Sequence, residues 1–194
     1  MERTLLIFKP DVLQRQILGE IITKFERKGM KIVAMKMVLP NRKQIEEHYT
    51  DKEEYLIQVG EKAKRGAIAR EENVDGWNSL EVGKKIRQWN IDYITCGPVL
   101  AVVMEGFNII SGVRKMLGTT SPADADVGTI RMDYSIDSYA LADEQSRSTR
   151  NMAHASDSVE SAQREIPIWF NEDEIVEYET AIEKIFYDAG WSNN

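Results

Sequence analysis

The stretch Gly97-Pro98-Val99-Leu100-Ala101-Val102-Val103-Met104 ends in six consecutive apolar residues. Apolar side chains here follow one another instead of alternating with polar ones, so both faces of a strand over 97–104 would be buried. A strand that is buried on both faces lies inside a sheet that is covered on both sides. The stretch therefore predicts a central β-strand around which the rest of the chain is organised.

Shorter apolar segments on both sides of this stretch repeat in a regular order. Further strands are predicted over 4–8, 30–38 and 151–154, and Pro10 and Pro40 end the first two. Capping signals and apolar residues at helical spacing predict helices over 18–25, 41–49, 109–117 and 157–169, and an acidic last helix over 172–187. Two β-α-β halves that share one sheet indicate an α/β (α+β) protein with the ferredoxin-like βαββαβ fold. We expect a four-stranded antiparallel sheet with peripheral helices.

Two polar segments interrupt this order. Residues 51–92 are charged and contain helical stretches, but they have too few large apolar residues to build a core of their own. Residues 119–150 are rich in Ser, Asp, Pro and Gly, which predicts a long loop, and such a loop in a compact domain is usually functional. We therefore expect a single domain over 1–194 with a helical insertion at about 51–92.

The charge of the chain is unevenly distributed. The net charge is −7, and residues 160–194, with nine acidic and two basic side chains, account for all of it. The balanced remainder does not suggest a basic surface for nucleic acid. No apolar run approaches the ~18 residues of a membrane span. The single cysteine, Cys96, excludes an internal disulfide, and with no export signal we expect a cytoplasmic protein without membrane contact.

The two histidines lie in different settings. His154 follows a short apolar stretch and precedes Ser156-Asp157-Ser158, which opens a helix. Because the N-terminus of a helix favours anions, a neutral imidazole here could attack phosphorus and carry a phosphoryl group. From position alone, a surface histidine near a helix cap is the alternative. His48 lies beside Glu46 and Glu47 in a charged helix, where we expect a solvated side chain.

Three basic residues, Lys9, Arg114 and Arg131, lie in short, unusual contexts. Each alone is typical of a solvated charge, but together with His154 they could clamp a polyphosphate. The sequence contains no G-x-x-x-x-G-K-[ST] loop, no G-x-G-x-x-G motif and no zinc-ligand spacing. Ser156 is too close to His154 in the sequence for a hydrolase triad, and no G-x-S-x-G elbow is present.

Five motifs, taken together and in order, are specific. They are Phe8-Lys9-Pro10-Asp11, Gly97-Pro98-Val99, Gly118-Thr119-Thr120-Ser121-Pro122-Ala123, Gly128-Thr129-Ile130-Arg131 and Asn151-Met152-Ala153-His154-Ala155-Ser156-Asp157-Ser158-Val159. The sequence resembles the nucleoside diphosphate kinases over about residues 3–49, 94–133 and 150–179. The resemblance implies a ping-pong reaction in which the γ-phosphate of a nucleoside triphosphate passes to His154 and then to a nucleoside diphosphate.

The resemblance also implies a role for each matching residue. His154 would be the nucleophile, Glu165 would hold the ring nitrogen that does not attack, Ser156 would support Glu165, and Tyr49 would pack beside the histidine. Phosphates would be bound by Lys9, Arg114, Thr120 and Arg131, and the sugar hydroxyls would be contacted by Lys9 and Asn151. Mg²⁺ would arrive on the nucleotide phosphates, without metal ligands from the protein. The family forms hexamers or tetramers, so a homo-oligomer is implied.

The sequence departs from the family pattern in length and at three glycines. Val12, Met132 and Ala155 stand where glycine is usual, and extra residues follow Tyr49 and Arg131. The first insertion replaces the hairpin that contacts the nucleotide base in the family, which leaves three aromatic candidates for stacking on the base, Tyr55, Trp77 and Trp89.

Two other functions compete with that of an enzyme. A non-catalytic nucleotide-binding regulatory module could keep the same fold, but it would have no need for the nucleophile and its orienting carboxylate. An RNA-binding ferredoxin-like domain would stack bases on aromatic residues of its central strands, and residues 97–104 contain none.

Overall fold

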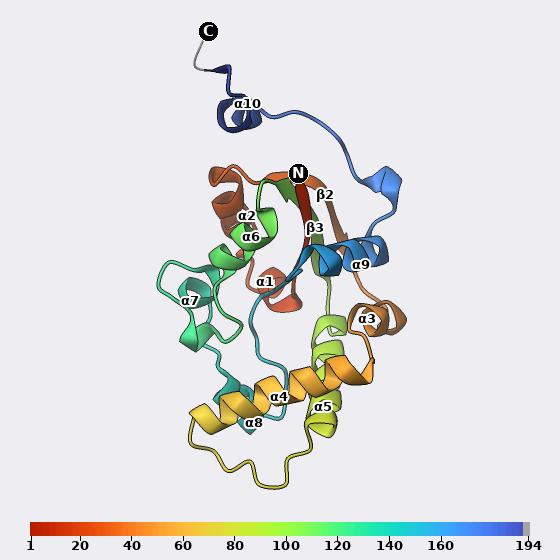
Figure 1. Ribbon diagram of the computed structural model, residues 1–194, viewed down its shortest axis with the longest axis vertical. Coiled ribbons are helices and arrows are strands. Elements are labelled where there is room, and N and C mark those ends of the chain that lie inside the picture. Colours follow the sequence, from red (N-terminus) through yellow and green to blue (C-terminus); the bar gives the residue numbers. More distant parts are fainter. Residues whose placement is uncertain (192–194) are drawn as a thin grey trace.

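A computed structural model describes residues 1–191, which form a four-stranded antiparallel sheet with helices on both faces (Figure 1). The strands are β1 (Glu2–Phe8), β2 (Lys31–Val38), β3 (Val99–Gly106) and β4 (Ala153–Ala155), in the order β2-β3-β1-β4. The apolar stretch after Pro98 is β3, which pairs with β1 on one side and β2 on the other. The predicted ferredoxin-like fold and its central strand are confirmed.

The two faces of the sheet bury separate apolar layers. Leu6 and Phe8 of β1 face α2 (Leu18–Arg27) and α6 (Ile109–Leu117), and both side chains are fully buried. Leu5 and Ile7 point the other way, toward α3 (Arg42–His48), α5 (Ser79–Thr95) and α9 (Val159–Trp169). Each such side chain contributes roughly 1.5–3 kcal/mol when it leaves water. The alternation along β1 therefore fixes the strand between two layers.

Pro10 follows the end of β1, as predicted, and its fixed φ also begins α1 (Pro10–Gln14). Three other predictions about local structure were wrong. The predicted loop 119–150 contains η1 (Pro122–Asp124), α7 (Ile130–Tyr134) and α8 (Tyr139–Glu144). The helix predicted over 157–169 begins two residues later, at Val159 of α9, and its cap is Ser158, whose hydroxyl accepts from the backbone of Ser161. The acidic tail forms η2 (Glu172–Glu174) and α10 (Ala181–Tyr187) instead of one helix.

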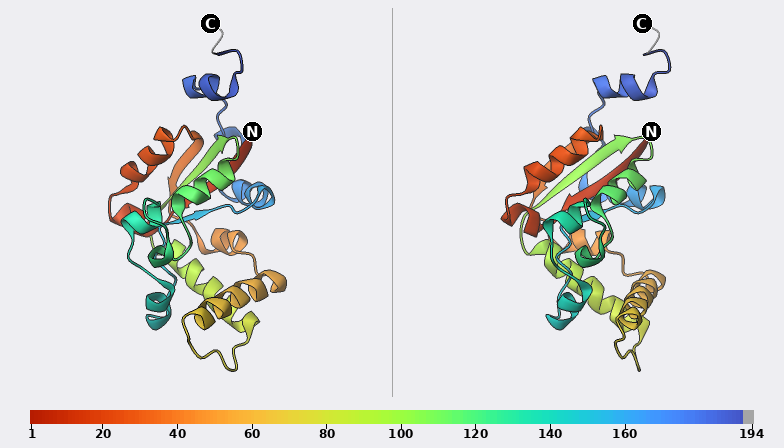
Figure 2. Two further views of the ribbon diagram at one scale, coloured as in Figure 1. Left: turned by 60° about the vertical axis from the view of Figure 1, so that its left-hand side comes forward. Right: turned by 90° about the vertical axis from the view of Figure 1, so that its left-hand side faces the viewer.

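Residues of the predicted insertion, 51–92, form a helical hairpin that extends from one end of the sheet, opposite α10 (Figures 1 and 2). Its helices, α4 (Glu53–Ala69) and α5, touch through their backbones. A Cβ added to Gly60 would lie 1.8 Å from the carbonyl oxygen of Ser79, and one added to Gly83 would lie 1.9 Å from that of Leu56. Two glycines therefore set the separation of the helices.

Replacing Gly83 with alanine is expected to force α4 and α5 apart. The methyl group would meet a backbone oxygen, which cannot swing aside, so the free energy of unfolding should fall by about 1–3 kcal/mol. Urea denaturation followed by circular dichroism measures the loss. Gly19→Ala is the matched control, because nothing lies within 4 Å of its added Cβ. Equal stability of the two variants would show that α4 and α5 can move apart without loss of stability.

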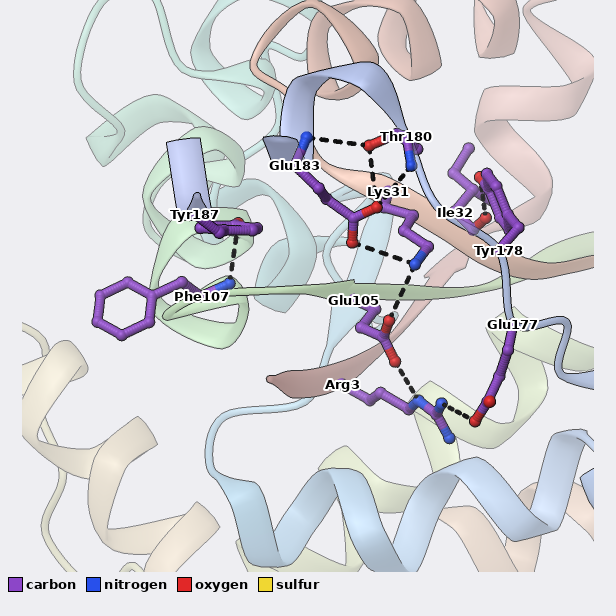
Figure 3. A network of polar contacts seen from close by, with 10 residues as sticks. All are labelled: Arg3, Lys31, Ile32, Glu105, Phe107, Glu177, Tyr178, Thr180, Glu183 and Tyr187. Carbon is purple, nitrogen blue, oxygen red and sulfur yellow. Dashed lines mark hydrogen bonds and ion pairs between the residues drawn. The ribbon is translucent and has the colours of Figure 1, made fainter. Parts of the chain in front are cut away.

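The C-terminal segment is anchored at the opposite end of the sheet, beside the start of β2 (Figure 3). The backbone N–H of Val176 donates to the carbonyl of Val33 at 2.8 Å, and the hydroxyl of Tyr178 donates to that of Ile32 at 2.7 Å. The half-buried network continues through ion pairs of Lys31 with Glu105 at 3.3 Å and with Glu183 at 3.1 Å. The tail is therefore tied to β2, and through Lys31 to β3, far from the α4–α5 hairpin.

No helix among residues 1–191 combines the length and the apolar character needed to cross a membrane.

Candidate active site

A cavity of about 500 Å³ lies between the end of the sheet and the inserted hairpin. Eight of the nine predicted site residues line it, namely Lys9, Tyr49, Arg114, Thr120, Arg131, Asn151, His154 and Glu165. The ninth, Ser156, is fully buried and contacts Glu165 instead. The fold thus gathers residues from the first strand, the loops before β4, and α9 around one space.

His154 is held in one orientation by a buried carboxylate. Strand pairing places it opposite Ile7, and its Nε2 lies 2.8 Å from Oε2 of Glu165. Ser156 donates to the same oxygen at 2.8 Å, and Arg164 donates to Oε1 at 2.8 Å. Burial alone would raise the pKa of Glu165, but hydrogen bonds and charges from His154, with the Ser156 contact, lower it. The ionised carboxylate keeps the proton on Nε2 and leaves Nδ1 with a lone pair.

Lys9 lies at the carboxyl end of β1 and is buried. Its Nζ donates to Oδ1 of Asn151 at 2.7 Å and lies 5.0 Å from the centre of the Tyr93 ring. Burial, and after it the charge of Arg131, lower the pKa of Lys9 to about 7, with Asp11 opposing them. The amine of the free protein is therefore partly neutral near pH 7.

Binding of ADP is expected to take up a proton at Lys9. A phosphate beside the amine favours the ammonium form, so the pKa of Lys9 is higher in the complex than in the free protein. Affinity should fall by up to tenfold per unit as pH rises above about 7 toward the pKa of the complex. Calorimetry in buffers of different ionisation enthalpy measures the uptake. After subtraction of the protons that ADP itself exchanges, the Lys9→Met variant should show no proton uptake. Unchanged uptake in this variant would show that Lys9 is not the group that takes up the proton.

Arg131 connects the loops around the cavity by hydrogen bonds to their backbone. It is buried, and its guanidinium donates to three carbonyl oxygens, those of Asn151 at 3.0 Å, Gly118 at 2.8 Å and Ala153 at 2.7 Å. A guanidinium has five N–H donors, so two remain for a ligand in the cavity. Asn151 in turn donates to the carbonyl of Thr120 at 3.2 Å. Arg114, in contrast, is exposed on α6.

The prediction that His48 is a solvated residue was wrong. It is 2% exposed, and its ring packs edge-on against His154 with ring centres 4.4 Å apart. Trp169 donates its indole N–H to Nδ1 of His48 at 3.3 Å. The signal for this burial is the spacing from Ile45, because residues three apart share one helix face, while Glu46 lies on the other. Sequence reasoning also missed Arg164, which binds Glu165.

The inserted segments supply most of the apolar wall of the cavity. Tyr55 and Trp89, two of the three candidates for base stacking, line it from α4 and α5, whereas Trp77 is not among the lining residues. Tyr139 and Ala142 line it from α8, in the region that had been predicted to be a loop. This apolar wall is therefore built from parts of the chain that the family motifs do not include.

A ferredoxin-like sheet that presents an oriented histidine to a cation-lined cavity is the framework of a phosphoryl-transfer enzyme. The family model described as nucleoside diphosphate kinase matches residues 2–57 and 61–175. The chain therefore belongs to the nucleoside diphosphate kinase family, and it transfers phosphoryl groups between nucleotides. The regulatory-module alternative is not favoured.

Relatives match along nearly their whole length. A nucleoside diphosphate kinase of Pyrobaculum aerophilum is 44% identical, covering 91% of this chain and 99% of the relative. One from Archaeoglobus fulgidus is 40% identical, covering 97% and 99%. The crystal structure of an NDP kinase from Pyrobaculum aerophilum superposes with a TM-score of 0.86 at 42% identity, covering 91% of this chain and 99% of that one.

A second solved structure bears on the chemistry. It is a transition-state mimic of the nucleoside diphosphate kinase from Borrelia burgdorferi with bound vanadate and ADP. This chain is 33% identical to it with a TM-score of 0.78, and 96% of each chain is covered.

Proposed function

We propose that His154 carries the phosphoryl group between the two nucleotides. Its Nδ1 attacks the γ-phosphorus of a nucleoside triphosphate, an N–P bond forms, and the bond to the β–γ bridging oxygen breaks with its electrons leaving on the diphosphate. A second nucleoside diphosphate then attacks the phosphohistidine and reverses these steps. The observation that carries the proposal is the 2.8 Å contact of Nε2 with Glu165, because it leaves Nδ1 free to attack.

The buried groups around His154 support this role. Glu165 stabilises the positive charge that the ring gains when Nδ1 bonds to phosphorus, and Ser156 holds the carboxylate in place. Tyr49 lies edge-on to His154, with ring centres 6.2 Å apart, and burial raises the pKa of its phenol. A protonated phenol can donate to the transferred group.

The cationic end of the cavity is proposed to hold the phosphates. Lys9, Arg114 and Arg131 supply charge, and the hydroxyl of Thr120 supplies a neutral donor. Asn151, which is fixed by Lys9 and by the carbonyl of Thr120, is proposed to contact the sugar together with Lys9. Phosphoryl transfer depends mainly on such positioning and charge neutralisation.

Mg²⁺ is proposed to enter on the nucleotide. Among the cavity-lining carboxylates, Glu165 accepts from His154, Ser156 and Arg164, Asp143 pairs with Arg70 at 3.2 Å, and Asp157 accepts from Ser161. These engaged carboxylates do not form a cage for a resident ion, and they fit a metal that keeps its own waters and nucleotide oxygens. The bound ion would neutralise phosphate charge during transfer.

The proposed intermediate is tested by labelling the wild-type chain with [γ-³²P]ATP and no acceptor. We expect about one acid-labile label per chain, located on His154 by peptide mapping and discharged by added GDP or UDP. A regulatory module would bind ATP without acquiring label. Label at another residue, or transfer without any label, would contradict the proposal.

A homo-oligomer, hexameric or tetrameric, and a cytoplasmic location complete the proposal. Strand β2 lies at the edge of the sheet, and Met35, Met37 and Leu39 on and beside it are more than half exposed, so this edge suits burial against a second copy. Sedimentation of the native protein gives its mass. The exposed thiol of Cys96 suits a reducing compartment.

A further inference from the structure

His48 has one ring nitrogen with a partner and one without. The indole N–H of Trp169 can only donate, so Nδ1 of His48 must accept and the proton of the neutral ring lies on Nε2. That Nε2 is covered from solvent and has no hydrogen-bond partner within residues 1–191. A buried donor without an acceptor costs free energy, and packing alone would be served by an apolar side chain.

The surroundings of His48 hold it neutral and fixed. Burial lowers its pKa well below the usual range, and the neighbouring His154 lowers it further. Its backbone carbonyl accepts from Arg164 at 3.1 Å, and Arg164 also donates to Glu165, the partner of His154. His48, Arg164, Glu165 and His154 therefore form a closed chain of contacts.

The ring of His48 lies beside the proposed nucleophile, with ring centres 4.4 Å apart. His48 lines the active-site cavity, and one of its ring nitrogens, one of His154 and a carboxylate oxygen of Glu165 all lie within 4.8 Å of one another. Glu165 already accepts three hydrogen bonds, from His154, Ser156 and Arg164. A group that enters the cavity can supply the acceptor that the second nitrogen of His48 lacks.

We propose that His48 is a further catalytic residue, whose Nε2–H donates to an oxygen of the phosphoryl group while that group is bonded to Nδ1 of His154. This inference rests on the proposed function. Phosphorylation of His154 brings three acceptor oxygens next to the ring against which His48 packs. A neutral donor satisfies one of them without placing a second cation against the imidazolium of the phosphohistidine.

Two variants of His48 separate the effect of its Nε2–H donor from the effect of its packing. His48→Asn keeps an oxygen near the position of Nδ1 for Trp169 but removes the outer N–H, whereas His48→Gln retains an amide N–H near the position of Nε2. In rapid-quench labelling with [γ-³²P]ATP, we expect the Asn variant to phosphorylate about 10–100-fold more slowly and the Gln variant to stay within about threefold of wild type. The KM for nucleotides should change less than threefold in both.

A spectroscopic measurement on the wild type does not depend on the variants folding. The ¹H–¹⁵N resonance of Nε2 in His48 should move downfield when His154 becomes phosphorylated, because the proton gains an acceptor. Absence of label on the wild type would overturn the phosphohistidine itself. Normal labelling with equal rates in the two variants, or with a stationary Nε2 resonance, would overturn only the role of His48.

Discussion

Replacing His154 with alanine is expected to lower phosphoryl transfer by about 10⁴–10⁶-fold, because no other group can carry the phosphoryl intermediate. Nucleotide binding should persist, since Lys9, Arg131 and Asn151 hold one another through hydrogen bonds that do not involve the histidine. Coupled assays with ATP and a panel of diphosphates measure the loss. Calorimetry with ADP should give a Kd within about threefold of wild type.

The Glu165→Gln variant is expected to lose less activity than the His154→Ala variant. It keeps the shape of the side chain but removes the charge that orients Nε2, so kcat should fall by only about 10–100-fold. The pH–rate profile should also change, because the ring of His154 loses its buried counter-charge. Near-normal turnover of His154→Ala would show that another residue is the nucleophile.

Replacing Arg131 with methionine is expected to damage both stability and activity. Three carbonyl groups, those of Gly118, Asn151 and Ala153, would lose their donor in the loops around the cavity. We expect the free energy of unfolding to fall by about 3–5 kcal/mol, since each buried carbonyl left without a partner costs about 1–3 kcal/mol and water recovers part of it. That loss corresponds to roughly 10 °C in Tm for a domain of this size.

The Arg114→Met variant separates loss of the proposed phosphate contact from loss of the loop support that Arg131 provides. Arg114 is exposed, so its variant should keep wild-type Tm within about 2 °C while nucleotide affinity falls by about tenfold. Calorimetric unfolding and ADP binding on the same samples give both quantities. A pair of variants with equal Tm would mean that Arg131 does not support the loops.

The sheet could be predicted from sequence because its signals are local. An apolar run such as 99–104 is buried wherever it lies, and Pro and Gly mark its limits. The short helices α7 and α8 escaped prediction because each contains about one turn or little more, with few apolar residues to show a period. The start of α8 could have been predicted from Ser138, a typical helix-capping residue, whose hydroxyl accepts from the backbone N–H of Leu141.

The structure brings the predicted site residues around one cavity, but the sequence does not show how they are connected. The family motifs point to His154, Glu165 and the basic side chains. They do not reveal that Arg131 donates three hydrogen bonds to backbone carbonyls. The burial of His48 depends on Trp169, which is distant in sequence, and two adjacent glutamates mask the apolar face of its helix. Such long-range hydrogen bonds have no periodicity that a single sequence can show.

The pairing of Ile7 with His154 joins the beginning of the chain to its last strand. During synthesis, β1 leaves the ribosome before its two neighbours and must wait for β3 on one side and β4 on the other, and such distant pairings are slow to form. Glu165 and Trp169, which fix the two histidines, emerge later still. The growing chain is thus expected to have no phosphotransferase activity until α9 has been translated, so unfinished chains do not consume nucleoside triphosphates.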